Sequence, residues 1–426
     1  MNIKEIYEKY SIHFKVETDT RKNLKNSIYF ALKGENFNGN KFAEDALKKG
    51  ANYAIVDEEE YLTDDRIILV DNVLETLQEL AKYHRIQLGI KIISLTGSNG
   101  KTTTKELINA VMSRRYNCVA TKGNLNNHIG VPLTLLSMKP NTEFGIVEMG
   151  ANHPGEIDLL CKIALPDYGY ITNFGKVHLE GFGDLNGVIK AKTELYRHLK
   201  RNNKTAFINS TDPVQVKNST DLNTITFGDE KSVFPVQFID ADPFVSLQFE
   251  NNKINSQLIG VYNYHNIATA VAIGKYFKVS DQEIKNAIEN YIPGNNRSQI
   301  IEKGSNKIIL DAYNANPTSM KVALENLSQL KAKNKIAILG DMFEIGKEEL
   351  LEHSTIVDQA QNTNIDTLIL IGETFSKVKT DSNKTKQYKS FEDFKDNFDS
   401  SEIKNCTVLI KASRGMALER VLEIIS

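Results

Sequence analysis

A lysine and two threonines follow a short glycine-rich turn at residues 97–103, which read GSNGKTT. An apolar run from Ile92 ends at Thr96, and Lys101 then opens a helical pattern, so the turn joins a strand to a helix. Free N–H groups at a helix start, an ammonium and a hydroxyl are the groups that hold nucleotide phosphates and Mg²⁺. The sequence therefore predicts that the protein uses a nucleoside triphosphate, with ATP as the expected one.

The glycine spacing of this turn differs from that of the common phosphate-binding loop, G-x-x-x-x-G-K-[ST]. Here the first glycine is Gly97, which gives the shorter pattern G-x-x-G-K-T-T. A helix cap beside a surface lysine is the alternative interpretation, but it leaves the coincidence of strand, glycines, lysine and threonines unexplained. The residues expected to contact the phosphates are Gly97, Ser98, Asn99, Gly100, Lys101, Thr102 and Thr103.

Three further polar residues lie where they could act beside such a loop. Glu148 ends an apolar stretch, and a carboxylate at the carboxyl edge of a parallel sheet can hold Mg²⁺ directly or through water. His178 follows another predicted strand, and Lys192 lies on a predicted helix. Taken alone, the acid could equally be an exposed strand end, and the histidine and the lysine would be read as solvated surface residues.

Apolar stretches alternate with helical patterns along most of the chain, which predicts the α/β class with mostly parallel sheets wrapped by helices. Residues 231–258 are expected to form an antiparallel flank, and residues 416–425 a final helix. Turn-forming residues at 293–296 indicate a hinge. The predicted strands lie at residues 27–31, 53–56, 67–70, 92–96, 144–148, 168–172, 206–209, 307–310, 335–339, 367–371 and 408–410. We expect three domains, at residues 1–88, 89–295 and 296–426.

The 426 residues carry a formal net charge of −2 and no basic block, which argues against nucleic acid as a partner. No apolar run approaches the ~20 residues that cross a bilayer, and the charged N-terminal stretch argues against an export signal. The three cysteines are widely spaced, as expected of reduced thiols. We expect a cytoplasmic monomer without membrane or nucleic-acid partners.

The order and spacing of the shortened loop, the Glu148 segment, the His178 segment and Lys192 resemble the Mur ligases, the ATP-dependent amide-forming enzymes of peptidoglycan precursor synthesis. Within that family, further segments resemble the members that add D-alanyl-D-alanine to UDP-N-acetylmuramoyl-tripeptide. These segments lie at residues 20–21, 31–35, 123–132, 311–320, 339–344 and 411–416, so the resemblance covers essentially the whole chain. It implies a small N-terminal α/β domain, a central parallel sheet with the phosphate loop, and a C-terminal Rossmann-like domain.

The resemblance also implies a mechanism. ATP phosphorylates the terminal carboxylate of the substrate, and the amine of the incoming dipeptide attacks the acyl phosphate. Two anions have to meet in the first step, so Lys101 and two Mg²⁺ ions are expected to offset their repulsion. Thr102 and Glu148 would bind one ion, and His178 and Lys192 the other, with Lys192 N-carbamylated to make an oxygen ligand. Lys101, His178, Lys192 and Arg297 are the residues expected to act in the reaction.

The remaining site residues are implied in the same way. The nucleotide is expected to contact His265, Asn266, Arg297, Asp311 and Asn314. The uridine diphosphate end of the substrate would be held by Thr20, Arg21 and Lys33, its muramoyl part approached by Asn124 and Asn127, and the amine substrate or its carboxylate recognised by Lys411, Ser413 and Arg414. Two positions depart from the family pattern: Thr269 stands where asparagine is usual, and Ala412 where glycine is commoner.

Two other functions remain open from the sequence. A folylpolyglutamate synthase-like ligase would share the short loop, but it gives no reason for the segments at residues 20–34 and 314–320. An ATP-binding regulator without catalysis would bind nucleotide and release no phosphate, and the presence of Glu148, His178 and Lys192 counts against it.

Overall fold

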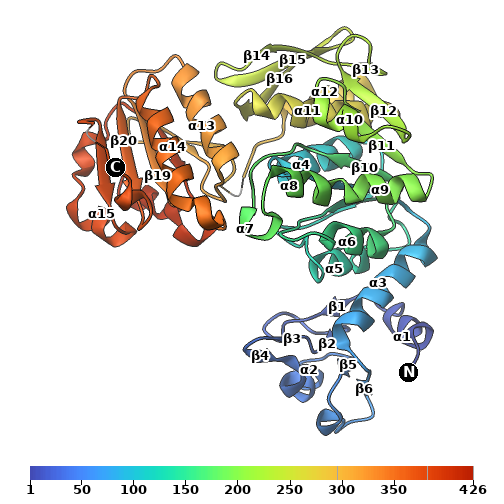
Figure 1. The fold of residues 1–426 in the computed structure, drawn as a ribbon. Helices are drawn as coiled ribbons and strands as arrows, with labels where there is room; N and C mark the ends of the chain where they lie inside the picture. The colour runs from blue at the N-terminus through green and yellow to red at the C-terminus, as the bar shows by residue number, and fades with distance from the viewer. Residues whose placement is uncertain (295, 381, 426) are drawn as a thin grey trace.

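The chain is arranged around separate sheets in a computed structural model that describes residues 1–294, 296–380 and 382–425. Figure 1 shows three bodies in chain order, with the central one in contact with both others. Most neighbouring strands are parallel, which confirms the predicted α/β class. Asn295, at the predicted boundary between the second and third domains, lies outside the described residues.

The N-terminal domain is built on a parallel sheet of order β1-β2-β5-β6. Alternate residues of its strands face opposite sides, so Phe30 and Ile55 pack in the cluster that includes Ile6, whereas Tyr29 and Ala54 pack on the other face. The elements of this domain are α1 (Ile3–Tyr10), β1 (Val16–Glu17), β2 (Ile28–Phe30), β3 (Lys33–Gly34), β4 (Phe37–Asn38), α2 (Ala43–Lys48), β5 (Tyr53–Val56) and β6 (Ile67–Leu69).

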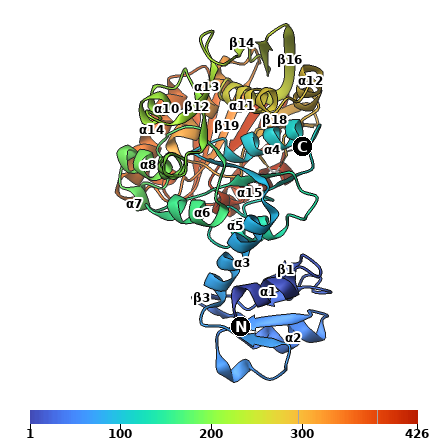
Figure 2. The ribbon, with the colours of Figure 1, turned by 90° about the vertical axis from the view of Figure 1, so that its right-hand side faces the viewer.

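Helix α3 (Val73–Leu88) connects the N-terminal domain to the central domain, as both ribbon views show (Figure 1, Figure 2). The side chain of Asn72 caps its first turn, and the helix ends at Gly89, which adopts the left-handed conformation with φ +61°. Its buried side packs on α1 and on two helices of the central domain, α5 (Gly130–Leu136) and α6 (Glu156–Ala164). The helix therefore belongs to the cores of both domains.

The central domain contains a seven-stranded sheet of order β13-β12-β11-β10-β7-β9-β8, and all its neighbouring pairs are parallel. Its strands are β7 (Lys91–Thr96), β8 (Cys118–Ala120), β9 (Phe144–Glu148), β10 (Tyr168–Ile171), β11 (Thr205–Asn209), β12 (Asn223–Gly228) and β13 (Phe234–Pro235). Strand β7 is buried from Ile92 to Thr96, as a strand covered on both faces must be. Because β9 and β10 flank it directly, the carboxyl ends of these three strands meet at one edge.

Helices cover both faces of this sheet. One face packs against α4 (Lys101–Met112), α11 (Tyr262–Tyr276) and α12 (Asp281–Glu289). The other packs against α5, α6, α8 (Leu185–Lys192) and α9 (Glu194–Arg201). Each layer of helices supplies apolar residues to a separate core.

An antiparallel sheet of order β14-β15-β16 flanks the central domain, which confirms the predicted flank for most of its range. Its strands are β14 (Gln237–Asp240), β15 (Phe244–Phe249) and β16 (Asn252–Ile259). The prediction is wrong for the start of the range, because β13 pairs in parallel with β12 at the edge of the large sheet.

The C-terminal domain has a six-stranded sheet of order β17-β18-β22-β19-β20-β21, parallel except for the edge pair β17 and β18. Its elements are β17 (Gln299–Lys303), β18 (Asn306–Leu310), α13 (Pro317–Gln329), β19 (Lys335–Gly340), α14 (Glu349–Gln361), β20 (Thr367–Ile371), β21 (Thr385–Tyr388), α15 (Phe391–Asn397) and β22 (Thr407–Lys411). The predicted final helix is wrong: Ala417 adopts φ +46° and separates two 3₁₀ segments, Arg414–Met416 and Leu418–Glu423.

None of the helices in the described ranges combines the length and the apolar character that crossing a bilayer requires. The three cysteines are free thiols.

Arg85 joins α3 to the central domain through a nearly buried ion pair. Its guanidinium lies 2.7 Å from Asp167 and also donates to the carbonyl oxygens of Ala164 and Leu165. Replacing Arg85 with alanine is expected to lower the free energy of unfolding by about 3 kcal/mol, because it leaves a partly buried carboxylate with one cation fewer. Urea unfolding measures this.

The matched control is Arg201→Ala, since Arg201 pairs with Asp158 on the exposed surface at 3.0 Å. That variant is expected to stay within about 1 kcal/mol of the parent protein. Equal effects of the two substitutions would contradict the structural role of Arg85.

Candidate active site

The turn after β7 is shaped by two glycines. Gly97 has φ +142°, and a Cβ there would lie 2.0 Å from Thr172 Oγ1, so the close approach requires glycine. Gly100 has φ +78° and precedes α4, which places a helix start at the loop. The ammonium of Lys101 donates to the carbonyl oxygens of Gly97 at 2.7 Å and Ser98 at 3.0 Å, which folds it back over the loop.

The loop lysine carries a weakly solvated charge. Burial lowers the pKa of Lys101 to about 8, the nearby Arg297 acts in the same direction, and the Glu148 carboxylate opposes both. The ammonium therefore gains from an anion bound beside it.

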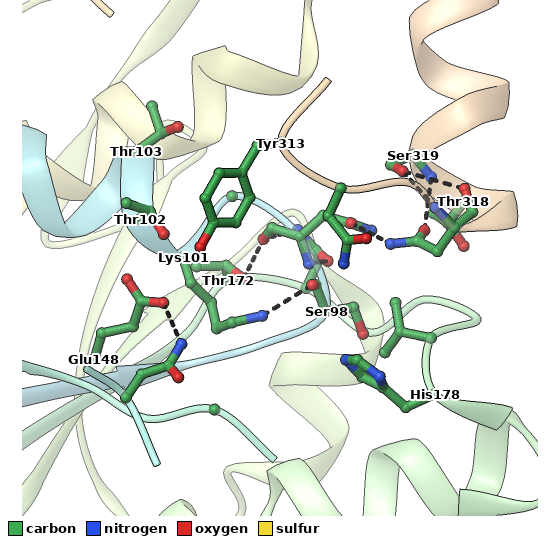
Figure 3. Close-up of a pocket in the computed structure, with 18 of the residues that line it drawn as sticks. Ser98, Lys101, Thr102, Thr103, Glu148, Thr172, His178, Tyr313, Thr318 and Ser319 are labelled. Carbon is green, nitrogen blue, oxygen red and sulfur yellow. Dashed lines mark hydrogen bonds between the residues drawn. The ribbon is translucent and has the colours of Figure 1, made fainter. Parts of the chain in front are cut away.

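Glu148 lies beside the loop because the register of β9 pairs it with Leu95 of β7. Its side chain is only 2 % exposed, and Asn126 Nδ2 donates to Oε1 at 2.8 Å. Within the described residues, Oε2 has no hydrogen-bond partner. Since a buried carboxylate oxygen without a partner is costly, this atom fits a cation site. In Figure 3, Thr102 lies beside the Tyr313 ring and Glu148 lies beneath Thr102.

Asn126 was not predicted as a site residue, although its neighbours Asn124 and Asn127 were. All three line the same cavity. The run of asparagines indicated the segment, but only the fold shows which amide reaches Glu148.

Lys192 lies at the end of α8 and is 1 % exposed. Its Nζ donates to the carbonyl oxygen of Ala151 at 3.1 Å and lies 5.2 Å from the centre of the Phe182 ring. Burial lowers the pKa of this amine well below its usual value, and the charge of Lys101 acts in the same direction. Burial and the charge of the loop lysine therefore both favour the neutral form of the Lys192 amine.

His178 begins the short helix α7 (Leu179–Phe182) in the left-handed conformation, with φ +47°. Its Nδ1 contacts a carboxylate oxygen of Glu344 from the C-terminal domain. Burial lowers the pKa of His178, and the Glu344 charge opposes this effect. The histidine thus lies both at the sheet edge and at the junction of two domains.

A cavity of about 1130 Å³ lies between the central and C-terminal domains. The structure brings most of the predicted site residues to its walls. These are Ser98, Asn99, Gly100, Lys101, Thr102, Thr103, Asn124, Asn127, Glu148, His178, His265, Asn266, Arg297, Asp311, Asn314, Lys411, Ser413 and Arg414. Gly97 and Lys192 do not line the cavity, but each contacts a residue that does, Lys101 and Ala151 respectively.

The predicted base-binding residues take two different roles. His265 lines the cavity, its Nδ1 lies 3.1 Å from Asn209 Nδ2, and burial lowers the pKa of this histidine. Asn266 accepts from Thr104 Oγ1 at 3.0 Å, and its side chain packs against Gly100. Asn266 therefore supports the phosphate loop.

Arg297 lies shortly before β17 and lines the cavity. Its guanidinium stacks 3.7 Å from the centre of the Tyr313 ring, a residue that sequence reasoning misses. Its buried Nε has no hydrogen-bond partner among the described residues. A planar cation with an unpaired N–H group is suited to a phosphate or carboxylate.

Lys411 was predicted to recognise the amine substrate or its carboxylate, but its ammonium is already held by other groups of the protein. Its buried ammonium lies 2.6 Å from the Asp311 carboxylate and 3.1 Å from the carbonyl oxygen of Asn314. It therefore ties the end of β22 to the loop after β18. Arg414 is more exposed and pairs with Glu419 at 2.9 Å.

The C-terminal domain contacts the phosphate loop and the segment before His178. Asn316 Nδ2 donates to Asn99 Oδ1 at 2.8 Å, and Lys176 pairs with Glu352 at 2.6 Å. Lys176 N also donates to Thr318 Oγ1 at 2.9 Å. The cavity is thus bounded by both domains in this structure.

Three predicted substrate residues lie apart from the cavity, in the N-terminal domain. Lys33 pairs with Asp57 at 2.9 Å, and Arg21 pairs with Asp19 at 2.8 Å on the exposed surface. Thr20 accepts a hydrogen bond at its carbonyl oxygen. Their predicted contact with the uridine diphosphate end stays a prediction.

In the part of the chain that the structure describes, no three His, Cys, Asp or Glu side chains form a metal-binding cluster. Cation binding at the sheet edge would therefore depend on Glu148 together with Thr102, His178 and a modified Lys192.

Comparison with known families accounts for nearly the whole chain. Residues 11–91 match "Mur ligase family, catalytic domain", residues 95–274 match "Mur ligase middle domain", and residues 296–414 match "Mur ligase, glutamate ligase domain". The chain belongs to the Mur ligase family.

Its relatives include one particular enzyme from several bacteria. The UDP-N-acetylmuramoyl-tripeptide--D-alanyl-D-alanine ligase of Bacillus subtilis is 34% identical over 98% of this chain and 94% of its own length. The enzyme of the same name from Escherichia coli is 30% identical over 96% and 92%.

Solved structures of MurF enzymes also resemble this chain over nearly its whole length. MurF from Acinetobacter baumannii is 29% identical, with a TM-score of 0.86 over 96% of this chain and 92% of that one. MurF ligase from Thermotoga maritima, in complex with ADP, is 27% identical with a TM-score of 0.83, over 96% of both chains. Folylpolyglutamate synthase from Mycobacterium tuberculosis, at 13% identity and a TM-score of 0.62, shares the fold alone.

The lowered pKa of Lys101 predicts a pH dependence for nucleotide binding. ATP affinity is expected to weaken as the pH rises through about 8, because the proton that pairs with the phosphates is lost. Titration of ATP into the protein from about pH 6.5 to about pH 9.5 measures this.

Lys101→Ala is the control, because it binds weakly and has no lysine to titrate. If the parent protein shows the same affinity across this range, the charge on Lys101 does not contribute to binding.

Proposed function

We propose that the protein is an ATP-dependent ligase that joins D-alanyl-D-alanine to UDP-N-acetylmuramoyl-tripeptide and releases ADP and phosphate. This is a step of peptidoglycan precursor synthesis, and we place it in the cytoplasm, carried out by a monomer. The observation that carries the proposal is the set of groups at one sheet edge: the Lys101 loop, the Glu148 oxygen that has no hydrogen-bond partner among the described residues, and the buried amine of Lys192.

Each of the three proposed domains binds a different one of the three substrates. Residues 1–88 hold the uridine diphosphate end, residues 89–295 bind ATP, and residues 296–426 bind the incoming dipeptide. Both the central and C-terminal domains of one chain line the cavity, which supports a site complete within a monomer.

The first chemical step joins two anions. A carboxylate oxygen of the tripeptide attacks the γ-phosphorus of ATP, the bond to the bridging oxygen breaks, and ADP leaves. Lys101 moves from its loop carbonyls to the phosphates, and Arg297 offers its free Nε–H to the same charge. Asn126 orients Glu148 throughout by donating to Oε1.

Two Mg²⁺ ions, when bound, would neutralise charge between the phosphates and the substrate carboxylate. Thr102 and Glu148 would hold one, and His178 and Lys192 the other. These side chains fit a cation site, because Glu148 Oε2 has no hydrogen-bond partner among the described residues.

Lys192 needs a modification to serve as such a ligand. Burial favours the neutral form of its amine. In that form the nitrogen can add to CO₂ and release one proton, which gives a carbamate with anionic oxygens. An unmodified ammonium at this position would repel a cation.

The second step forms the amide. The dipeptide nitrogen attacks the acyl carbon and loses a proton, and phosphate leaves from the tetrahedral intermediate. Contacts such as those of Asn316 with Asn99 and Lys176 with Glu352 hold the domains together and limit access of water to the acyl phosphate.

A matrix of substrates tests the proposal. Phosphate release is expected only when ATP, UDP-N-acetylmuramoyl-tripeptide and D-alanyl-D-alanine are all present. Folate with glutamate serves as the competing pair and is expected to give none. Release with the competing pair, or ATP binding without release in any mixture, would favour one of the two alternatives.

Lys192→Ala tests the carbamate. Activity is expected to fall by about 100-fold or more, because a ligand beside the phosphates is lost. Short-chain carboxylic acids are expected to restore part of it by supplying the missing oxygens. Lys190→Ala, an exposed neighbour on the same helix, is the control and should keep full activity. Unchanged activity in Lys192→Ala would show that this role is wrong.

A further inference from the structure

His353 is fully buried in the C-terminal domain, and both of its ring nitrogens contact backbone groups. Met342 N donates to Nε2 at 3.0 Å, and Nδ1 lies 2.7 Å from the carbonyl oxygen of Glu349. Because Nε2 accepts a hydrogen bond, the proton belongs on Nδ1, which donates to Glu349. The neutral ring thus bridges the first turn of α14 and the loop after β19.

That loop, residues 341–344, carries two side chains into the cavity. Phe343 and Glu344 both line it, and Glu344 contacts His178 of the central domain. Phe343 N donates to Ser413 Oγ at 2.9 Å, so the loop also sets the position of the segment after β22. These groups form the part of the cavity that the C-terminal domain presents to the substrates.

The loop is held at its base by two buried polar side chains. The Asp341 carboxylate accepts hydrogen bonds from Thr374 N and Phe375 N, both at 2.9 Å. His353 holds the next residue, Met342, and the edge of its ring packs on Phe375 with 4.6 Å between the ring centres. Asp341 anchors the loop to the segment that follows β20, and His353 fixes the position of the next residue in the loop.

We propose that His353 is a positioning residue for the ligase reaction, whose neutral ring holds the 341–344 loop so that Phe343 and Glu344 face the dipeptide. This proposal rests on the function proposed above for the C-terminal domain. It assigns His353 no contact with any substrate, because the ring is buried beneath the loop.

Protonation of the His353 ring would remove the hydrogen bond that Nε2 accepts from Met342 N. An imidazolium has N–H groups on both nitrogens, and its Nε2–H would face the N–H of Met342. The charged groups around the ring are the carboxylates of Asp341, 3.7 Å from Nε2, and of Glu349 and Glu352, the last paired with Lys176. Burial lowers the pKa of His353 even so. The neutral form therefore holds at neutral pH, and the bridge weakens as the pH falls below the usual histidine value.

Two substitutions separate the bridge from simple packing. His353→Gln places an amide oxygen near the position of Nε2 and can still accept from Met342 N. His353→Asn places its amide near Nδ1 and leaves Met342 N without an acceptor. In steady-state assays of ADP release, His353→Asn is expected to raise the KM for D-alanyl-D-alanine about tenfold, a change typical of one lost buried hydrogen bond. The KM for ATP should change by less than about twofold in both variants.

The pH profile gives a second readout. As the pH falls below the usual histidine value, down to the lowest pH at which the protein stays folded, the dipeptide KM of the parent protein is expected to rise relative to that of His353→Gln, which has no ring to protonate. Identical profiles in the two proteins, or equal increases in both KM values for His353→Asn, would overturn the proposal.

Hydrogen exchange at the Met342 amide tests the bridge without any substrate. Exchange is expected to be faster in His353→Asn than in His353→Gln, and equal rates would overturn the proposal. If the parent protein released no ADP with D-alanyl-D-alanine, the proposed function would fail, and this exchange measurement would still decide whether His353 positions the loop.

Discussion

The parallel pairing of β7 with β9 on one side and β10 on the other is the constraint on which the site depends. Leu95 lies opposite Glu148, and Thr96 lies opposite Ile171, so three chain segments leave the sheet at one level. The phosphate loop, the acid and the segment that leads to His178 are thereby brought together from positions up to about eighty residues apart, as expected at the carboxyl edge of such a sheet. A shift of one residue in the pairing of β7 with β9 would turn Glu148 away from the loop.

The charged groups at this sheet edge are suited to binding charged ligands, namely phosphates and cations. Burial lowers the pKa of both Lys101 and Lys192, and the charge of Lys101 lowers the pKa of Lys192 further. Glu148 keeps one oxygen free, and Arg297 keeps one N–H free among the described residues. Polar groups left without partners in a buried site are unfavourable for the free protein, and binding of phosphates and cations removes that cost.

The sequence was sufficient for the features that depend on local pattern. The loop, the strand that ends at Glu148 and the alternation of strands with helices follow from residue types within short windows. The roles of Asn126, Tyr313 and His353 could not be predicted, because each arises from a contact with a residue distant in the chain or from another element. The last segment was mispredicted because its apolar spacing suits a helix, whereas the left-handed Ala417 interrupts it.

Helix α3 has 16 residues, which corresponds to a length of about 24 Å. Arg85 and Asp167 hold its end against the central domain, and at its start Val73 N donates to Asp57 of the N-terminal domain. A helix held at both ends fixes the distance between the N-terminal surface around Lys33 and the phosphate loop. If Lys33 holds the uridine diphosphate end as proposed, a molecule with the same reactive carboxylate on a shorter body would reach only one of the two sites, so the length of a substrate would contribute to its selection.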